Sequence, residues 1–336
     1  MARADLAILG AGSWGTALAL HLSRSGRSVA LWVHDGELAE RLRSDRVNAR
    51  YLPDHTLPQS VRVTHDIAEA VEGASDILLV VPSHYCRQVL VACRPLIKNP
   101  ASLCVAAKGI ESDTLMTVSE VVLDVLGPEA AQRTAVLSGP SFAQEVARGH
   151  PTAVVVASRI PDLAGRLQRV VSSGSLRAYT NTDLVGVELG GALKNVIAIG
   201  AGAVDGLGYG ANTRAALITR GLAEISRLAE ALGGRRETLA GLAGLGDLVL
   251  TCTGDLSRNR RVGLELARGR GLEEILGGTS EVAEGVRTAR AACALGERHG
   301  VEMPISETVE ALLAGRVRPD QGVERLMSRQ LRSEQE

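Results

Sequence analysis

The 336-residue sequence predicts an α/β fold in which a doubly wound, mainly parallel sheet is followed by an all-α C-terminal domain. Short β-branched apolar runs alternate with helical patterns up to about residue 180, which is typical of a parallel sheet covered by helices. Beyond Asp183 the chain is rich in Ala, Leu, Gly and Arg, and its apolar residues recur at helical spacing. A chain of this length supports about two domains, which we place at residues 1–182 and 183–336.

The first strand and helix enclose the most informative motif. The apolar run Leu6 to Leu9 breaks into Gly10-Ala11-Gly12-Ser13-Trp14-Gly15, and a helical pattern begins at Thr16. In this arrangement the first glycine allows a tight turn, the second lets the backbone approach a pyrophosphate, and the third lets the helix pack on the strand. The positive end of the helix favours phosphate. The motif predicts a Rossmann-like dinucleotide site at Gly10, Gly12 and Gly15, although an ordinary βα turn is the alternative in a chain with 37 glycines.

Six further apolar runs continue the alternation, and we interpret them as parallel strands of the same sheet. These strands are expected at Ser28–Val33, Asp76–Val81, Ser102–Ala107, Thr134–Ser138, Ala153–Ala157 and Leu176–Tyr179, with helices at Glu37–Arg43, Ser141–Arg148 and Asp162–Val171.

Composition excludes several classes of partner. Lys and Arg number 37 against 38 for Asp and Glu, so no overall field recruits nucleic acid or an anionic membrane. One Phe, two Trp and four Tyr leave few platforms for stacking bases. The five cysteines form no CxxC pair and stand at no zinc-finger spacing, so no metal site is predicted. With no leader pattern and no apolar run near 20 residues, we expect a cytoplasmic protein without membrane or nucleic-acid partners.

Residues that directly follow the predicted strands are the first candidates for ligand contact, because ligands bind beyond the carboxyl ends of such strands. Besides the glycine loop, these junctions are Val81-Pro82-Ser83-His84, Ala107-Lys108-Gly109 and Ser138-Gly139-Pro140-Ser141-Phe142-Ala143. Lys108 would place a cation in the crevice, where it could polarise a carbonyl or hold an anion; a solvated loop lysine is the alternative. Ser141 is a natural cap for the helix that follows, and capping alone could explain it.

The segment from Asp183 to Gly202 predicts a buried helix with an unusual lysine. Gly186, Gly190, Lys194 and Ala198 recur every four residues and therefore share one face, which is nearly bare apart from the lysine. A buried ammonium needs a partner or a lowered pKa. A structural salt bridge could satisfy Lys194, but we favour a catalytic lysine that a small ligand approaches.

A second anion site is predicted after the segment Gly241 to Asp247. Ser257-Arg258-Asn259-Arg260-Arg261 opens a helical pattern, and hydroxyl, guanidinium and amide groups at a helix N-terminus suit a phosphate monoester. A solvated basic helix start is the alternative. Together with the glycine loop, this cluster implies two phosphate-bearing ligands.

From Gly10 to about Ser306 the chain resembles the bacterial NAD(P)-dependent glycerol-3-phosphate dehydrogenase family. The resemblance rests on GAGSWGTALA, VVPSH, AAKGIE, SGPSFA, LGGALKNVIAIGAG, GLAGLGDLVLTCTG, SRNRR and VAEGVRTA, in that order. It implies reversible NAD(P)H-dependent reduction of dihydroxyacetone phosphate to sn-glycerol 3-phosphate, the backbone precursor of glycerophospholipids. The family pattern makes Lys194 the catalytic acid/base, assigns Lys108, Gly139, Ser141, Lys194, Asp247, Ser257, Arg258 and Asn259 to substrate, and assigns Ser13, Trp14, His34, Lys108, Ala143, Arg258, Val282 and Glu284 to coenzyme. Ser141 stands where many members carry Thr, which preserves the hydroxyl.

The expected coenzyme is NADPH, with NADH possible. An acidic residue about 20 positions beyond the glycines would bind ribose hydroxyls and favour NAD, and Asp35 meets that count. Asp35 could equally cap the helix near Glu37, while His34 with Arg41 or Arg43 could accept a 2′-phosphate. Two rival functions are a related two-domain reductase of another small hydroxy or keto acid and a non-catalytic dinucleotide sensor. The helical domain could supply a homodimer interface.

Overall fold

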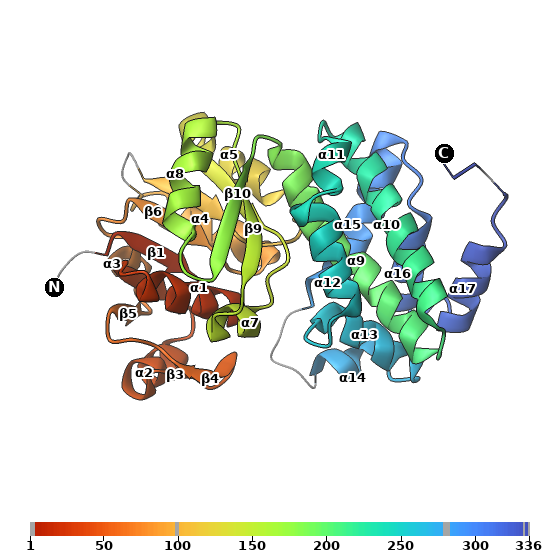
Figure 1. Ribbon diagram of the computed structural model, residues 1–336, viewed down its shortest axis with the longest axis horizontal. Helices are drawn as coiled ribbons and strands as arrows, with labels where there is room; N and C mark the ends of the chain where they lie inside the picture. Colours follow the sequence, from red (N-terminus) through yellow and green to blue (C-terminus); the bar gives the residue numbers. More distant parts are fainter. Residues whose placement is uncertain (1–3, 98–100, 278–282, 332, 335–336) are drawn as a thin grey trace.

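The computed structural model describes residues 4–97, 101–277, 283–331 and 333–334, and its two halves lie side by side along the longest axis (Figure 1). The N-terminal half holds an eight-stranded sheet, and the C-terminal half is built from helices. The sheet ends with β10 (Leu176–Asn181), and α9 begins at Leu184. The fold is therefore a Rossmann-like sheet domain joined to a helical domain, as the sequence predicts.

The sheet has the strand order β10-β9-β8-β7-β6-β1-β2-β5. Strand β1 pairs with β2 on one side and β6 on the other, all parallel, so the order reverses beside β1 and opens a crevice at the carboxyl ends of β1 and β6. The strands are β1 (Leu6–Leu9), β2 (Val29–Trp32), β5 (Val61–Thr64), β6 (Asp76–Leu79), β7 (Ser102–Val105), β8 (Thr134–Ser138), β9 (Thr152–Ala157) and β10, with a separate hairpin of β3 (Val47–Asn48) and β4 (Leu52–Thr56).

The sheet is mainly parallel, as predicted, but the interpretation of all six later apolar runs as parallel strands is wrong at one edge. Strand β9 pairs antiparallel with β8, and β10 follows β9 in parallel, so these last two strands run against the others. A parallel return needs a long crossover, but α7 (Ala143–Arg148) between β8 and β9 has only 6 residues. The sequence interpretation also assigned no structure to the β3–β4 hairpin or to β5, which are short and carry polar residues.

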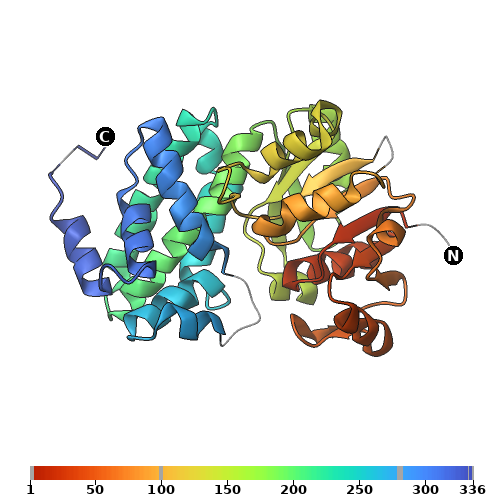
Figure 2. The same ribbon diagram turned by 180° about the vertical axis from the view of Figure 1, so that it is seen from behind.

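Helices cover both faces of the sheet (Figures 1 and 2). Along β1, Leu6 and Ile8 enter one hydrophobic core while Ala7 and Leu9 enter the other, which explains the uninterrupted apolar sequence of a central strand. The first core is closed by α1 (Ser13–Arg24), α2 (Gly36–Asp45), α7 and α8 (Pro161–Val171), and the second by α3 (Ile67–Val71), α4 (Cys86–Cys93), α5 (Val118–Leu126) and α6 (Pro128–Ala131). The short 3₁₀ helix η1 (Ser83–Tyr85) directly precedes α4.

The helical domain is organised around α9 (Leu184–Gly206), which the other helices surround. By length and composition α9 could cross a membrane, but 89% of its most apolar stretch is buried inside the protein, as in a core helix. Around it lie α10 (Ala211–Ala231), α11 (Arg236–Leu239), the π-helical segment η2 (Leu242–Gly246), α12 (Asp247–Thr253), α13 (Arg258–Ala267), α14 (Leu272–Gly277), α15 (Glu284–His299), α16 (Pro304–Leu313) and α17 (Pro319–Met327).

Candidate active site

The glycine loop between β1 and α1 has the geometry of a phosphate cradle. Gly10 has φ +120° and a Cβ there would lie 3.0 Å from Val80 backbone atoms, while a Cβ on Gly15 would lie 1.9 Å from the Gly10 carbonyl oxygen. A Cβ on Gly12 would meet nothing within 4 Å. No side chain caps α1 at Gly12, and its first turn holds no acidic residue. The loop therefore leaves open space in front of helix N–H groups that favour an anion.

Trp14 adds a second sign that the loop is built for a ligand. Its indole Nε1 is buried and has no hydrogen-bond partner among the described residues. A buried N–H without a partner is costly, so such a group is often completed by a bound molecule or water. Ser13 and Trp14 form the first turn of α1 and fit the predicted dinucleotide site.

Asp35 lies shortly after β2, where its side chain acts as a helix cap. Its Oδ1 accepts a hydrogen bond from the Leu38 backbone N–H at 3.1 Å, so Asp35 caps α2. The exposed His34 packs edge-on against Trp32, with ring centroids 5.7 Å apart. Arg50, which the sequence reasoning did not consider, brings Nη1 within 3.9 Å of Asp35 Oδ2.

Of the two arginines expected beside His34, one is already engaged. Arg43 donates from Nε to the Val63 carbonyl at 3.0 Å and forms an ion pair with Glu40. Arg41 is exposed. Arg43 is therefore engaged beside this strand end, whereas Arg41 and Arg50 are exposed and lie near Asp35.

One carboxylate joins the two lysines singled out in the sequence. Asp247 Oδ1 forms a short ion pair with Lys194 Nζ, and Oδ2 lies 2.8 Å from Lys108 Nζ. The side chain of Asp247 is 1% exposed, that of Lys194 8% and that of Lys108 17%. Lys194 Nζ also donates to Thr251 Oγ1 at 3.0 Å, and Lys108 Nζ donates to the Gly139 carbonyl at 3.0 Å. The cluster brings together side chains from the end of β7, from α9 and from α12.

The electrostatics of this cluster leave Lys194 able to exchange a proton near neutrality. Burial is the main reason that the pKa of Lys194 falls to about 7, and the Lys108 cation lowers it further while Asp247 opposes the shift. Burial alone would raise the pKa of Asp247, but the two ammonium groups hold it below its ordinary value. Asp247 is thus a fixed anion between two cations, one of which can lose its proton.

The bare face of α9 serves close packing rather than ligand approach. A Cβ on Gly190 would lie 2.7 Å from the Ala243 carbonyl oxygen, and one on Gly186 would lie 2.2 Å from Asp183 Oδ2. Gly190 therefore lets η2 approach α9, which brings Asp247 at the start of α12 to Lys194, while Gly186 leaves room for the side chain of Asp183. The expectation that glycines frame Lys194 for a ligand is wrong for Gly186 and Gly190.

The loop after β8 contributes its backbone. Gly139 has φ +120°, and its carbonyl oxygen accepts hydrogen bonds from Lys108 Nζ and from Ser141 Oγ, the latter at 2.9 Å. Ser141 is not the cap of α7, because Phe142 occupies that position and the helix starts at Ala143. The Ser141 hydroxyl instead folds back on its own turn.

Ser257, Arg258 and Asn259 lie at the start of α13, as predicted, but their side chains differ in the hydrogen bonds that they already make within the protein. Ser257 Oγ accepts from the Arg260 backbone N–H at 3.2 Å and so caps the helix. Buried Asn259 donates to Asn195 Oδ1 and accepts from the Gly285 N–H, each at 2.9 Å. The half-buried side chain of Arg258 makes no hydrogen bond to another described residue. Arg258 is the member of the three that remains available for an anion.

Glu284 lies at the start of α15, opposite the segment that follows β6. Its carboxylate accepts from the Ser83 N–H at 2.9 Å and from the Ser83 hydroxyl at 2.7 Å. Burial raises the pKa of Glu284, and Arg258 is among the cations that oppose this shift. The contact holds the helical domain against the strand end beside the glycine loop. Val282, the other predicted residue of this region, lies outside the described residues.

Sequence reasoning missed two side chains that contact the lysines. Thr251 follows Asp247 by one helical turn and accepts from Lys194, and Asn195 Nδ2 donates to the Lys108 carbonyl at 3.3 Å. The lysines themselves stand out, since lysine occurs in the sequence only at Lys98, Lys108 and Lys194 whereas arginine supplies the other basic residues; no such signal marks Thr251 or Asn195. Lysine can lose its proton in a buried site, and arginine cannot.

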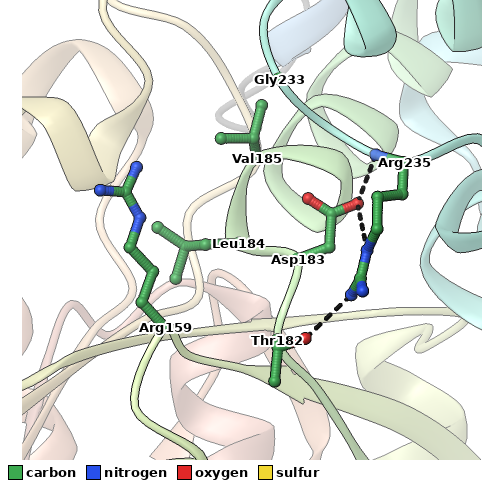
Figure 3. Close-up of a pocket in the computed structure, with 7 residues that line it drawn as sticks. All are labelled: Arg159, Thr182, Asp183, Leu184, Val185, Gly233 and Arg235. Carbon is green, nitrogen blue, oxygen red and sulfur yellow. Dashed lines mark hydrogen bonds and ion pairs between the residues drawn. The ribbon is translucent and has the colours of Figure 1, made fainter.

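A separate cavity of about 330 Å³ lies at the start of α9 (Figure 3). Its polar groups largely satisfy one another, because Arg235 donates from its backbone N–H to Asp183 at 2.8 Å and from Nη2 to Thr182 Oγ1 at 2.9 Å. None of the predicted site residues lines it; the lining is Arg159, Thr182, Asp183, Leu184, Val185, Gly233 and Arg235. Across the described ranges, no group of three or more His, Cys, Asp or Glu side chains could hold a metal ion.

Comparison with known proteins agrees with the two-part fold. Residues 5–164 match the model of the NAD-dependent glycerol-3-phosphate dehydrogenase N-terminus, and residues 183–324 match that of its C-terminus. The chain belongs to this family. Over 329 residues it is 53% identical to glycerol-3-phosphate dehydrogenase [NAD(P)+] of Geobacter sulfurreducens, with 98% of each chain covered. The corresponding protein of Nitratidesulfovibrio vulgaris is also 53% identical, with 98% of this chain and 99% of that protein covered.

A solved structure gives the same result. The crystal structure of glycerol-3-phosphate dehydrogenase from Coxiella burnetii superposes with a TM-score of 0.93 at 42% identity, covering 97% of this chain and 99% of that chain. This chain is therefore an NAD(P)-dependent oxidoreductase of the glycerol-3-phosphate dehydrogenase family, with a Rossmann-like N-terminal half and a helical C-terminal half.

Proposed function

We propose that the protein catalyses the reversible, NAD(P)H-dependent reduction of dihydroxyacetone phosphate to sn-glycerol 3-phosphate. The observation that carries the proposal is the Lys108–Asp247–Lys194 cluster, because reduction of a ketone needs a cation and then a proton at the carbonyl oxygen. The bound dihydronicotinamide supplies the hydride. Side chains of this protein supply the positive charge and the proton at the carbonyl oxygen.

Lys194 acts as the general acid in reduction and as the general base in oxidation. Its pKa of about 7 suits both tasks, since a catalytic group works best when its pKa lies near the working pH. Asp247 holds the ammonium of Lys194 in place, and Thr251 fixes its direction through the 3.0 Å hydrogen bond. Lys108 contacts the substrate oxygen and the coenzyme and adds positive charge beside the developing alkoxide.

The substrate phosphate binds at the start of α13. Arg258 supplies the guanidinium, which pairs with phosphate through two parallel hydrogen bonds, and Ser257 and Asn259 complete the site. Gly139 and Ser141 contact the substrate from the loop after β8. Anchoring the phosphate at a distance from the reacting carbon lets binding energy position the carbonyl at Lys194.

The coenzyme binds along the carboxyl edge of the sheet, in the domain formed by residues 1–182. Gly10, Gly12 and Gly15 admit the pyrophosphate, and Ser13, Trp14, His34, Lys108, Ala143, Arg258, Val282 and Glu284 complete the contacts. NADPH is the favoured form, since Asp35 is occupied as a helix cap and the exposed His34, Arg41 and Arg50 near it could accept a 2′-phosphate. NADH remains a usable coenzyme.

In the cell we place the enzyme in the cytoplasm, where its product would feed glycerophospholipid synthesis. We expect neither nucleic acid nor membrane as a partner, and the helical domain, residues 183–336, is the surface through which a homodimer would form.

The test compares dihydroxyacetone phosphate with unphosphorylated dihydroxyacetone, each with NADPH and NADH, by following absorbance of the reduced nicotinamide. We expect a kcat/KM for the phosphate ester at least about 100-fold higher than for dihydroxyacetone, because the phosphate contacts contribute charged hydrogen bonds. Equal rates on both would favour a reductase of another small keto acid. Coenzyme binding without turnover would favour a sensor.

A further inference from the structure

Three glutamates of the helical domain, the buried Glu188 and Glu224 and the half-buried Glu284, each bind the start of another helix through a serine. Glu224 accepts from the backbone N–H of Ser306 at 2.9 Å and from its hydroxyl at 2.7 Å, inside the helical domain. Glu284 binds Ser83, and Glu188 binds Ser119, in the same way. The last two contacts cross from the helical domain to the sheet domain. The proposed reaction assigns no role to Glu188.

Glu188 shares one face of α9 with two residues that touch the Lys108 segment. Residues 188, 191 and 195 are separated by three and four positions, so they lie along one side of the helix. A Cβ on Gly191 would lie 3.7 Å from Lys108 Cγ, and Asn195 donates to the Lys108 carbonyl at 3.3 Å. This face is therefore turned toward the segment that carries Lys108.

The segment from Lys108 to Ser119 is folded into a compact unit. Ile110 and Thr117 form an antiparallel bridge, and the Glu111 N–H donates to the Met116 carbonyl at 2.9 Å. Thr117 caps α5, and Ser119 follows in the first turn of that helix. Asn195 thus holds the segment at Lys108, and Glu188 holds it at Ser119, while Lys194 extends from the same rigid helix.

We propose that Glu188 is a positioning residue for the reaction, acting through Ser119 to fix the Lys108 segment relative to Lys194. The carboxylate accepts a backbone N–H at 2.9 Å and a hydroxyl at the positive end of α5. Burial raises the pKa of Glu188 to about 7, and the hydrogen bonds from Ser119 and Thr117 oppose that shift. The other charged group facing it from α5 is Glu120, whose carboxylate binds the Thr117 N–H.

The inference rests on the proposed reaction, and its test uses paired variants. In E188Q the negative charge is lost while the volume is kept, and the amide nitrogen can only donate, so the Ser119 hydroxyl can no longer donate to that atom as it does to the carboxylate. S119A removes the same hydroxyl contact from the other side and introduces no buried polar group. E224Q and S306A are matched controls, since they break an equivalent buried contact inside the helical domain.

We expect E188Q and S119A each to lower kcat/KM for dihydroxyacetone phosphate about 10-fold or more, because a small misplacement of a catalytic group is costly. Coenzyme affinity, measured by nicotinamide fluorescence, should fall much less than kcat/KM, because the glycine loop is untouched and Lys108 is one of several coenzyme contacts. The double variant should lose no more than either single variant, since both break one contact. E224Q and S306A should lower the melting temperature yet keep kcat/KM within about twofold.

The proposal is overturned if E188Q and S119A keep wild-type kcat/KM, if their losses multiply in the double variant, or if E224Q loses as much activity as E188Q. If E188Q does not fold, S119A alone carries the test by the same criteria. A wild-type protein inactive on dihydroxyacetone phosphate would instead refute the proposed function, which separates the two failures.

Discussion

The two parts of the proposed site, the glycine loop of the sheet domain and the Lys194–Asp247 pair of the helical domain, are suited to ligands in opposite ways. On the sheet side, the glycine loop offers backbone N–H groups and open space at Gly12, with no charged side chain in the first turn of α1. On the helical side, Lys194 and Asp247 are buried charges held by direct contact with each other. The first arrangement suits a pyrophosphate that stays unchanged, and the second suits a group whose charge changes during reaction. We therefore predict that single substitutions can impair ligand binding and the chemical step separately.

The largest expected effect is on the helical side. K194A should lower kcat by roughly 10³-fold, as expected for loss of a general acid, while coenzyme affinity stays unchanged. K194R keeps a cation but cannot release its proton, so it should be almost as inactive. Steady-state rates and coenzyme titration measure both quantities. Activity of K194R close to wild type would show that Lys194 supplies charge alone.

The phosphate site should give a smaller and more selective loss. R258A should lower kcat/KM for dihydroxyacetone phosphate about 100-fold, mostly through KM, because a charged bidentate contact is lost. With saturating coenzyme, the slow rate on dihydroxyacetone should hardly change, because this substrate has no phosphate for Arg258 to bind. Arg261, exposed on the same helix, provides the control R261A, which should stay within about twofold of wild type. Equal losses in the two variants would assign the effect to the general charge of α13.

A substitution in the glycine loop should weaken coenzyme binding without lowering the stability of the protein. G12A adds a methyl group where the protein has nothing within 4 Å, so the melting temperature should not fall, while the KM for coenzyme should rise about 10-fold as the methyl meets the pyrophosphate. Gly210 also has open space around it, and G210A should leave the KM unchanged. An unaltered KM in G12A would place the pyrophosphate elsewhere.

The same contrast explains what the sequence could predict. The glycine loop is local, since strand, turn and helix follow one another within about 20 residues, and its geometry agrees with the prediction. Lys194 was recognised because a lysine in an apolar helix conflicts with its surroundings. The start of α13 was also predicted, since Ser257 is a cap of ordinary type.

The remaining features depend on contacts between distant segments. Asp247 bridges Lys108 and Lys194, which are 139 and 53 positions away in sequence, so no local pattern announces the bridge. The reversal of β9 depends on how the chain returns after β8, which apolar periodicity does not report. Ser141 is a local exception: it was assigned to a cap because its neighbours are helical, but α7 begins at Ala143 after Phe142, and the Ser141 hydroxyl binds the Gly139 carbonyl.

The most direct test of the account measures kcat/KM against pH in both directions of the reaction, from about pH 6 to 9. Because burial lowers the pKa of Lys194 to about 7, the protonated form that reduction needs disappears as pH rises through that value, and the neutral form that oxidation needs appears. We predict that kcat/KM falls with pH for dihydroxyacetone phosphate and rises with pH for sn-glycerol 3-phosphate, with both changes centred near pH 7. Changes in the same direction, or a profile flat across this range in wild type, would contradict the role of Lys194.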